Sequence, residues 1–201
     1  PYTTLFRSII QDDKVSLVPA DDLWGMDTFD TQDALRAQVH KEVRALCIGP
    51  AGERLSRIAT IHTGTSSTAG QGGFGAVMGS KKLKAISVVG SGAVSVADPE
   101  MLDSLLKAVG QQVRAYRAIP NLTEQNKALA CDRGGRVRPY ACTASCPTPC
   151  NRYYSDMPGV AYPERRWEGH WACVGSMFRG LPEGGAISYD GLFDWQMGTY
   201  G

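Results

Sequence analysis

The clearest hydrophobic pattern in this chain lies in residues 97–117, where apolar residues recur at the spacing of a helix. They fall on one stripe, which consists of Met101, Leu105, Leu106 and Val109. Asp98 is a preferred N-cap residue, and Pro99 suits the first helical position because no partner for its nitrogen is needed there. The pattern therefore predicts an amphipathic helix that begins at Pro99.

Shorter patterns predict alternating strands and helices ahead of that helix. Strands are expected at Lys14–Val18, at residues 44–49 before the Gly49-Pro50 stop, and at residues 83–90. Helices are expected in residues 27–43, with Thr28 or Asp30 as N-cap, and from residue 75 onward. Residues 49–61 fit either a short helix or a strand.

The texture of the chain changes from Ile119 onward, where proline, glycine, cysteine and aromatic residues become denser. The sequence therefore predicts an α+β protein, with a mixed α/β domain over residues 9–95 and the start of a helical domain over residues 96–201. Pro1–Ser8 matches the translation of a common sequencing-library adapter. We expect this segment to be foreign to the fold and to join no sheet. The chain is then interpreted as an internal fragment of a longer protein.

Composition narrows the function classes. The chain has 201 residues, 43% of them hydrophobic and 20% charged, with a net charge of +1. Neither a basic patch for nucleic acid nor an apolar run of the ~20 residues that span a bilayer is present. Three of the six cysteines lie within nine residues. This crowding favours metal ligation in a reducing, cytoplasmic compartment over disulfides.

The crowded cysteines are Cys142, Cys146 and Cys150, in the run ACTASCPTPC. Three thiolates at this spacing suit an iron–sulfur cluster, which commonly takes three ligands close in sequence and a fourth from elsewhere. Zinc is the alternative, although it usually takes paired CxxC knuckles or added histidines. The remaining cysteines are expected to be packed thiols: Cys47, Cys131 and Cys173.

A glycine-dense segment, TAGQGGFGAVMGSKK, occupies residues 68–82. Its glycines are Gly70, Gly72, Gly73, Gly75 and Gly79. Glycine allows close approach of the backbone to a ligand, and a loop that leads into a helix offers unpaired N–H groups to an anion. The sequence therefore predicts that Gly70–Gly75 lines a cleft with its amides facing open space. The alternative is a tight turn packed against a sheet.

Acidic residues and a histidine follow the cysteines. Glu164, Glu168 and His170 lie among Trp167 and Trp171. Aromatic side chains that remove water from a carboxyl raise its pKa, which suits a general acid or base near neutral pH. These three residues are the candidate catalytic group, with surface carboxylates and a packed histidine as the alternative.

The runs IGPAGERLSRIATI and AGQGGFGAVMGSKKLKAISVVG resemble the N-terminal domain of the aldehyde ferredoxin oxidoreductase family. The resemblance implies a tungsten or molybdenum bis-pyranopterin cofactor, with Mg bridging the pterin phosphates. It assigns the cofactor-binding residues Ser67, Thr68, Ala69, Gly70, Gln71, Gly72 and Gly73. The family usually carries arginine in a run like RAAGRGG, where this chain has Ser67 and Gln71.

The same resemblance extends to the second half of the chain. It implies that Cys142, Cys146 and Cys150 hold a [4Fe–4S] cluster, although the family pattern CxxCxxxC is here CxxxCxxxC. Glu164 aligns best with an active-site glutamate in a family run like GPEYE. Asp190 and Asp194 resemble two acids of the family run DLGLD, which hold pterin amino groups; a helix N-cap is the alternative for Asp190.

The resemblance implies an oxidoreductase that converts aldehydes to carboxylic acids. Electrons would pass through the cluster to ferredoxin or another electron-transfer protein. The substrate would be a small aldehyde or an acyl-CoA. A homodimer is one expected form of the protein. Within the family, a benzoyl-CoA reductase-type subunit is the rival, favoured by the cysteine spacing and by the EGHW and DWQM runs. A non-catalytic iron–sulfur or zinc binding module is the rival of another class.

Overall fold

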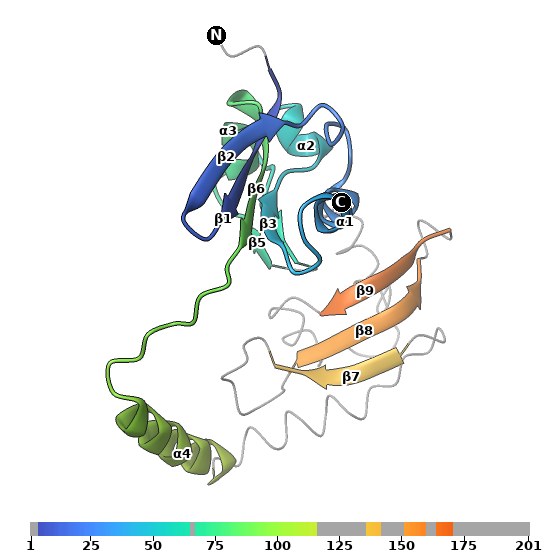
Figure 1. Cartoon of the computed structure of the whole chain (residues 1–201). Helices are drawn as coiled ribbons and strands as arrows, with labels where there is room; N and C mark the ends of the chain where they lie inside the picture. Colours follow the sequence, from blue (N-terminus) through green and yellow to red (C-terminus); the bar gives the residue numbers. More distant parts are fainter. Residues whose placement is uncertain (1–3, 65–66, 116–135, 142–150, 160–163, 171–201) are drawn as a thin grey trace, which may run out of the picture. The chain divides into compact units, whose positions relative to one another are not determined.

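The computed structural model describes residues 4–64, 67–115, 136–141, 151–159 and 164–170 (Figure 1). The chain divides into two compact units, with the boundary between Gly92 and Ala93. The sequence pattern predicts this boundary between residues 95 and 96. The architecture is a mixture of helices and strands, so the predicted mixed α/β character is confirmed.

The first unit is built on a six-stranded sheet in the order β2-β1-β6-β3-β4-β5. The β1–β6 pair is parallel and the other neighbours are antiparallel. The strands are β1 Phe6–Gln11, β2 Lys14–Pro19, β3 Arg44–Cys47, β4 Ile61–Thr63, β5 Ser67–Ala69 and β6 Leu83–Val89. The helices are α1 Thr28–Gln38, α2 Pro50–Glu53 and α3 Phe74–Ser80.

Local signals account for most of these elements, but the start of α1 differs from the prediction. Its N-cap is Asp27, whose carboxylate accepts hydrogen bonds from the amides of Phe29 at 2.9 Å and Asp30 at 2.8 Å. Thr28 and Asp30 are wrong as N-caps because both already lie inside the helix. Residues 49–61 contain both of the open alternatives, since α2 begins at Pro50 and β4 at Ile61.

The core of the first unit is small and lies between α1 and the sheet. Its buried side chains are Leu23, Leu35, Val43, Ala45, Cys47 and Ala85. Burial raises the pKa of the Cys47 thiol to about 12, so the thiol stays protonated. Cys47 is therefore a packed thiol, as predicted.

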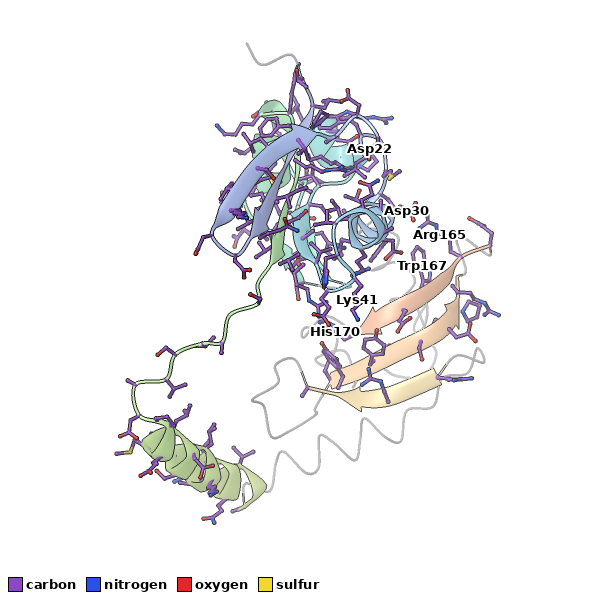
Figure 2. All side chains as sticks on the ribbon, in the orientation of Figure 1. Asp22, Asp30, Lys41, Arg165, Trp167 and His170 are labelled. Carbon is purple, nitrogen blue, oxygen red and sulfur yellow. The ribbon has the colours of Figure 1, made fainter. Side chains whose placement is uncertain are left out.

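Strand β1 corrects the expectation for the beginning of the chain. It pairs with β2 on one side and with β6 on the other, in register from Phe6 onward. Ser8 is buried, and Arg7 forms an ion pair with Asp22 at 3.3 Å; Figure 2 labels Asp22. The expectation that Pro1–Ser8 joins no sheet is wrong for Phe6, Arg7 and Ser8, because their backbone lies between two hydrogen-bonded neighbours.

A buried ion pair ties three parts of the first unit together. The Lys84 ammonium on β6 lies 2.5 Å from the Glu53 carboxylate on α2, and neither side chain is more than 6% exposed. Lys84 also donates to the carbonyl of Met26 at 2.8 Å, while Glu53 accepts from the amide of Gly25 at 2.9 Å. Both charges are thus hydrogen-bonded as well as paired, which burial of ions requires.

The second unit contains the predicted amphipathic helix, α4 Pro99–Ala115. The Asp98 carboxylate accepts from the amide of Met101 at 2.9 Å, which confirms the predicted N-cap. A three-stranded antiparallel sheet follows, formed by β7 Arg136–Tyr140, β8 Asn151–Pro158 and β9 Arg166–His170. The sequence pattern predicts a helical domain here and misses these strands. Among the helices of the described ranges, none has the length and apolarity to cross a membrane.

Candidate functional site

The glycine segment separates into two groups by what surrounds each glycine. A Cβ at Gly73 would lie 2.2 Å from the carbonyl oxygen of Arg57, at Gly75 2.5 Å from that of Thr60, and at Gly79 2.0 Å from that of Gly52. Gly73 also has a φ of +68°, which side chains rarely adopt. These glycines allow α3 to pack against the backbone of residues 52–60. Packing alone therefore requires glycine at these positions.

The other group faces outward. Gly70, Gln71 and Gly72 are exposed, and a Cβ at Gly70 would meet only the Thr68 hydroxyl at 3.3 Å and a Thr60 methyl at 4.0 Å. Within the described part of the chain, the amides of these three residues make no hydrogen bond. We call Gly70–Gly72 the open turn. It presents backbone N–H groups to solvent, next to the edge strand β5.

The open turn includes fewer residues than the sequence predicted. The amide of Gly75 donates to the carbonyl of Ala59 at 3.0 Å, and both Gly73 and Gly75 are buried. The expectation that the amides of Gly70–Gly75 all face open space is therefore wrong for Gly75. The segment is exposed at residues 70–72 and packed from residue 73, while the predicted cleft stays a prediction.

Edge strand β5 carries Ser67, Thr68 and Ala69 and pairs only with β4 among the described strands. His62 of β4 is opposite Thr68 and is fully buried. Its Nδ1 lies 3.0 Å from the hydroxyl of Thr28, and its ring meets the ring of Phe29 edge-on at 5.5 Å. Burial lowers the pKa of His62 to about 4, so the ring is neutral at pH 7.

The lowered pKa of His62 leads to a prediction for the stability of the chain in acid. The unfolded chain binds a proton at His62 below the ordinary pKa of 6.5, whereas the folded chain binds it only near pH 4. Stability is therefore lost as the pH falls through this window, by about 3 kcal/mol at 1.36 kcal/mol per pKa unit. In urea titrations, His62→Gln is expected to lose about that much less than the parent chain between about pH 7 and pH 4. The control is His40→Gln at an exposed histidine. If His62→Gln lost as much stability between pH 7 and pH 4 as the parent chain, the prediction would be contradicted.

A second group of polar residues lies on one face of the β7–β9 sheet. We call it the tyrosine face; its members are Arg138, Tyr140, Tyr153, Glu168 and His170. The Tyr153 hydroxyl donates to the Glu168 carboxylate at 2.8 Å, and the Arg138 guanidinium lies 4.2 Å from the centre of the Tyr153 ring. Tyr140 stacks on His170 with 4.6 Å between ring centres.

The pKa values of Tyr153 and His170 on the tyrosine face are both shifted by burial, and that of Tyr153 also by Glu168. Partial burial, together with the hydrogen bond to Glu168, raises the pKa of Tyr153 to about 12. Burial lowers the pKa of His170 below 6.5. At pH 7 the face therefore combines a neutral histidine, a protonated phenol and a carboxylate held by that phenol.

The structure places the predicted acids differently from the expected aromatic pocket. Glu168 and His170 share a face of β9, as residues two apart in a strand do, while Trp167 is buried on the other side. Figure 2 labels Trp167 and His170. Trp167 therefore does not shield Glu168, and Glu164 is exposed as well. No sequence signal marks Arg138, Tyr140 or Tyr153, because their contacts arise from cross-strand pairing.

Five predicted ligands lie outside the described residues: Cys142, Cys146, Cys150, Asp190 and Asp194. Among the residues that are described, no group of three or more His, Cys, Asp or Glu side chains is arranged to hold a metal ion. The cysteine triplet and the two aspartates therefore remain predictions.

The first unit thus combines a mixed six-stranded sheet with an exposed turn whose amides make no hydrogen bond among the described residues. Residues 7–90 match the family described as aldehyde ferredoxin oxidoreductase, N-terminal domain. Over these residues the chain is similar to that domain, which confirms the resemblance for this part of the chain.

Named relatives are similar to about half of the chain. The tungsten-containing aldehyde ferredoxin oxidoreductase of Pyrococcus furiosus is 44% identical over 112 residues, which is 55% of this chain and 18% of the relative. The aliphatic sulfonate oxidoreductase WOR-like subunit of the same organism is 38% identical over 112 residues, 49% of this chain and 18% of the relative. The matched part of this chain thus spans about a fifth of these relatives.

Among solved structures, the active site complex BamBC of benzoyl coenzyme A reductase with 1,5-dienoyl-CoA has a similar fold. The TM-score is 0.72 at 23% identity, covering 99% of this chain and 36% of that chain. At this identity the likeness concerns the fold alone.

Proposed function

We propose that this chain supplies part of the cofactor-binding surface of a tungsten-pterin oxidoreductase. The observation that carries the proposal is the open turn, Gly70–Gly72, because it lies within the matched residues 7–90. Curated relatives with 44% identity over 112 and 92 residues carry the name tungsten-containing aldehyde ferredoxin oxidoreductase. The proposed reaction is the oxidation of a small aldehyde to a carboxylic acid.

The residues present fit a phosphorylated pterin. Exposed amides without a hydrogen bond can donate to phosphate oxygens, and Gly70 itself adds no side chain to block the approach. Residues 67–73 contain no cation, so the contact would be made by main-chain N–H groups and by the Ser67, Thr68 and Gln71 side chains. A bound Mg ion would supply the positive charge that residues 67–73 lack.

The bound tungsten would supply the two-electron chemistry, and the protein would bind, orient and move protons. We assign proton handling to Glu168 and His170, because they share one face of β9 and His170 is neutral at pH 7. Tyr153 would hold the Glu168 carboxylate in place through its hydrogen bond. Glu164 remains a further candidate for the same role.

Electron transfer is proposed for the second half of the chain. Cys142, Cys146 and Cys150 would give three thiolate ligands to a [4Fe–4S] cluster, and Asp190 and Asp194 would bind pterin amino groups. Ferredoxin or another electron-transfer protein would accept the electrons. A cytoplasmic location fits the free thiols that such a cluster requires.

A benzoyl-CoA reductase-type subunit is the second candidate. The CxxxCxxxC spacing and the EGHW run differ from the aldehyde enzymes, so the sequence leaves room for an acyl-CoA substrate. Similarity to a sulfonate oxidoreductase subunit also means that membership of the family does not fix the substrate.

The test is the cofactor content of the chain after anaerobic expression with tungstate in a host that makes pyranopterin. We expect tungsten and pterin to copurify with the chain, with pterin in excess of tungsten, and iron with sulfide in separate analyses. A chain that carries zinc and no pterin would instead be a binding module. Aldehyde and acyl-CoA substrates, supplied to the loaded protein, separate the two enzymatic candidates.

A further inference from the structure

We propose that Gln32 is a positioning residue that holds strands β4 and β5, and with them the open turn, in the geometry that receives the cofactor. The inference rests on the proposed function for the identity of the ligand. Its structural content is a link from helix α1 to the candidate binding strand, made by a buried side chain that no sequence motif marks.

Gln32 binds the backbone of Gly64 at two points. Its Nε2 donates to the Gly64 carbonyl at 2.9 Å, and its Oε1 accepts from the Gly64 amide at 2.8 Å. The same Nε2 donates to the carbonyl of Thr28 at 3.0 Å. The side chain thus pairs with Gly64 as a neighbouring strand would, although it belongs to a helix. Gln32 is only 4% exposed, so these partners replace water that the amide has lost.

Thr28 provides a second link one turn earlier on α1. Its hydroxyl contacts Nδ1 of His62 at 3.0 Å, two residues before Gly64. Its carbonyl also accepts a long contact from the Cys47 thiol at 3.5 Å. The polar side of α1 is therefore directed at β4, with Asp27 fixing the start of the helix.

Because β4 is paired with β5, the contacts that fix β4 also restrain β5. His62 is in register with Thr68, Ile61 with Ala69 and Thr63 with Ser67. Each strand has only three residues, and β5 has no other neighbour in the described sheet. Two such short strands are stable only when something else fixes them. The contacts from α1 hold β4 and β5 in place, and they thereby set the position of Ala69 and of Gly70, which follows it.

The experiment measures amide hydrogen exchange in the full chain without any ligand. Gln32→Met removes both contacts to Gly64 at similar volume, and Gln38→Met is its control. Gln38 lies on the same helix, where its amide donates only to the exposed Asp22. We expect exchange at Ser67–Ala69, the strand paired with β4, to become roughly tenfold faster in Gln32→Met. We expect no change in Gln38→Met, and none in strand β6, which serves as the internal reference.

Gln32→Glu adds a second test, which distinguishes the specific contacts of Gln32 from a general loss of stability. The introduced carboxylate, when ionised, accepts from the Gly64 amide but cannot donate to the Gly64 carbonyl. Protonation restores that donor, and burial beside two carbonyl oxygens raises the pKa of such a group. The stability lost through His62 below pH 6.5 affects the parent and the variant alike, so the parent chain at the same pH is the reference. Protection at Ser67–Ala69 is therefore expected to fall at about pH 8 and to recover towards about pH 5.5.

Three results would overturn the inference: normal exchange at Ser67–Ala69 in Gln32→Met, an equal increase in β6, or no recovery of Gln32→Glu on acidification. The outcome is independent of the cofactor assignment. A chain that shows all the expected exchange changes but never carries pterin would contradict the proposed function and leave the role of Gln32 in shaping the turn intact.

Discussion

Replacing Lys84 by methionine is expected to lower the free energy of unfolding by about 3–5 kcal/mol. The substitution leaves the Glu53 carboxylate buried without its cation, and the Met26 carbonyl without its donor. The Gly25 amide alone then holds the charge. Urea unfolding at neutral pH measures the loss.

The control is the same substitution in an exposed ion pair. Lys107 and Asp103 lie 2.6 Å apart on α4, with exposed fractions of 72% and 61%. Lys107→Met is expected to change stability by less than about 0.5 kcal/mol, since solvent screens such pairs. Equal effects of the two substitutions would show that the Lys84 pair contributes no more than a surface pair.

Gly79→Ala is expected to destabilise the chain by about 3 kcal/mol, the upper range for overpacking. The new Cβ would lie 2.0 Å from the Gly52 carbonyl oxygen, so helices α2 and α3 would have to separate. The intrinsic preference of alanine for helices offsets no more than about 1 kcal/mol of this cost. Thermal and urea unfolding report the change.

Gly70→Ala is the matched variant in the open turn. Its Cβ meets nothing closer than the Thr68 hydroxyl at 3.3 Å, and the expected change is within about 0.5 kcal/mol. If Gly70→Ala were as destabilising as Gly79→Ala, the division of the glycine segment into a packed and an open part would be wrong.

Local signals account for the elements that the sequence predicted. The start of α4 follows from Asp98 and Pro99, and the strand character of β6 from its β-branched residues. Both depend on neighbours within a few positions. The strands β7–β9 were missed. In β8, Asp156 has a φ of +55° and the register with β9 shifts, which interrupts the alternation there.

The candidate site was predictable only where the family runs are present. These runs located the glycine segment, but sequence alone could not separate Gly79 from Gly70. The difference depends on the Gly52 carbonyl, which is distant in the chain. The contacts of Gln32 with Gly64 and of Lys84 with Glu53 were hidden for the same reason. Glutamine and lysine are ordinarily exposed, so nothing in the pattern marks them as buried.

The central claim is that the open turn contacts the pterin cofactor, and the pterin content of two matched variants tests it most directly. Gly70→Val adds bulk where the cofactor would lie, and Gly92→Val adds it where nothing lies within 4 Å. Both variants should keep the parent melting temperature. We expect Gly70→Val to lose pterin and tungsten while Gly92→Val retains them. A Gly70→Val chain with the full parent content of pterin would contradict the claim.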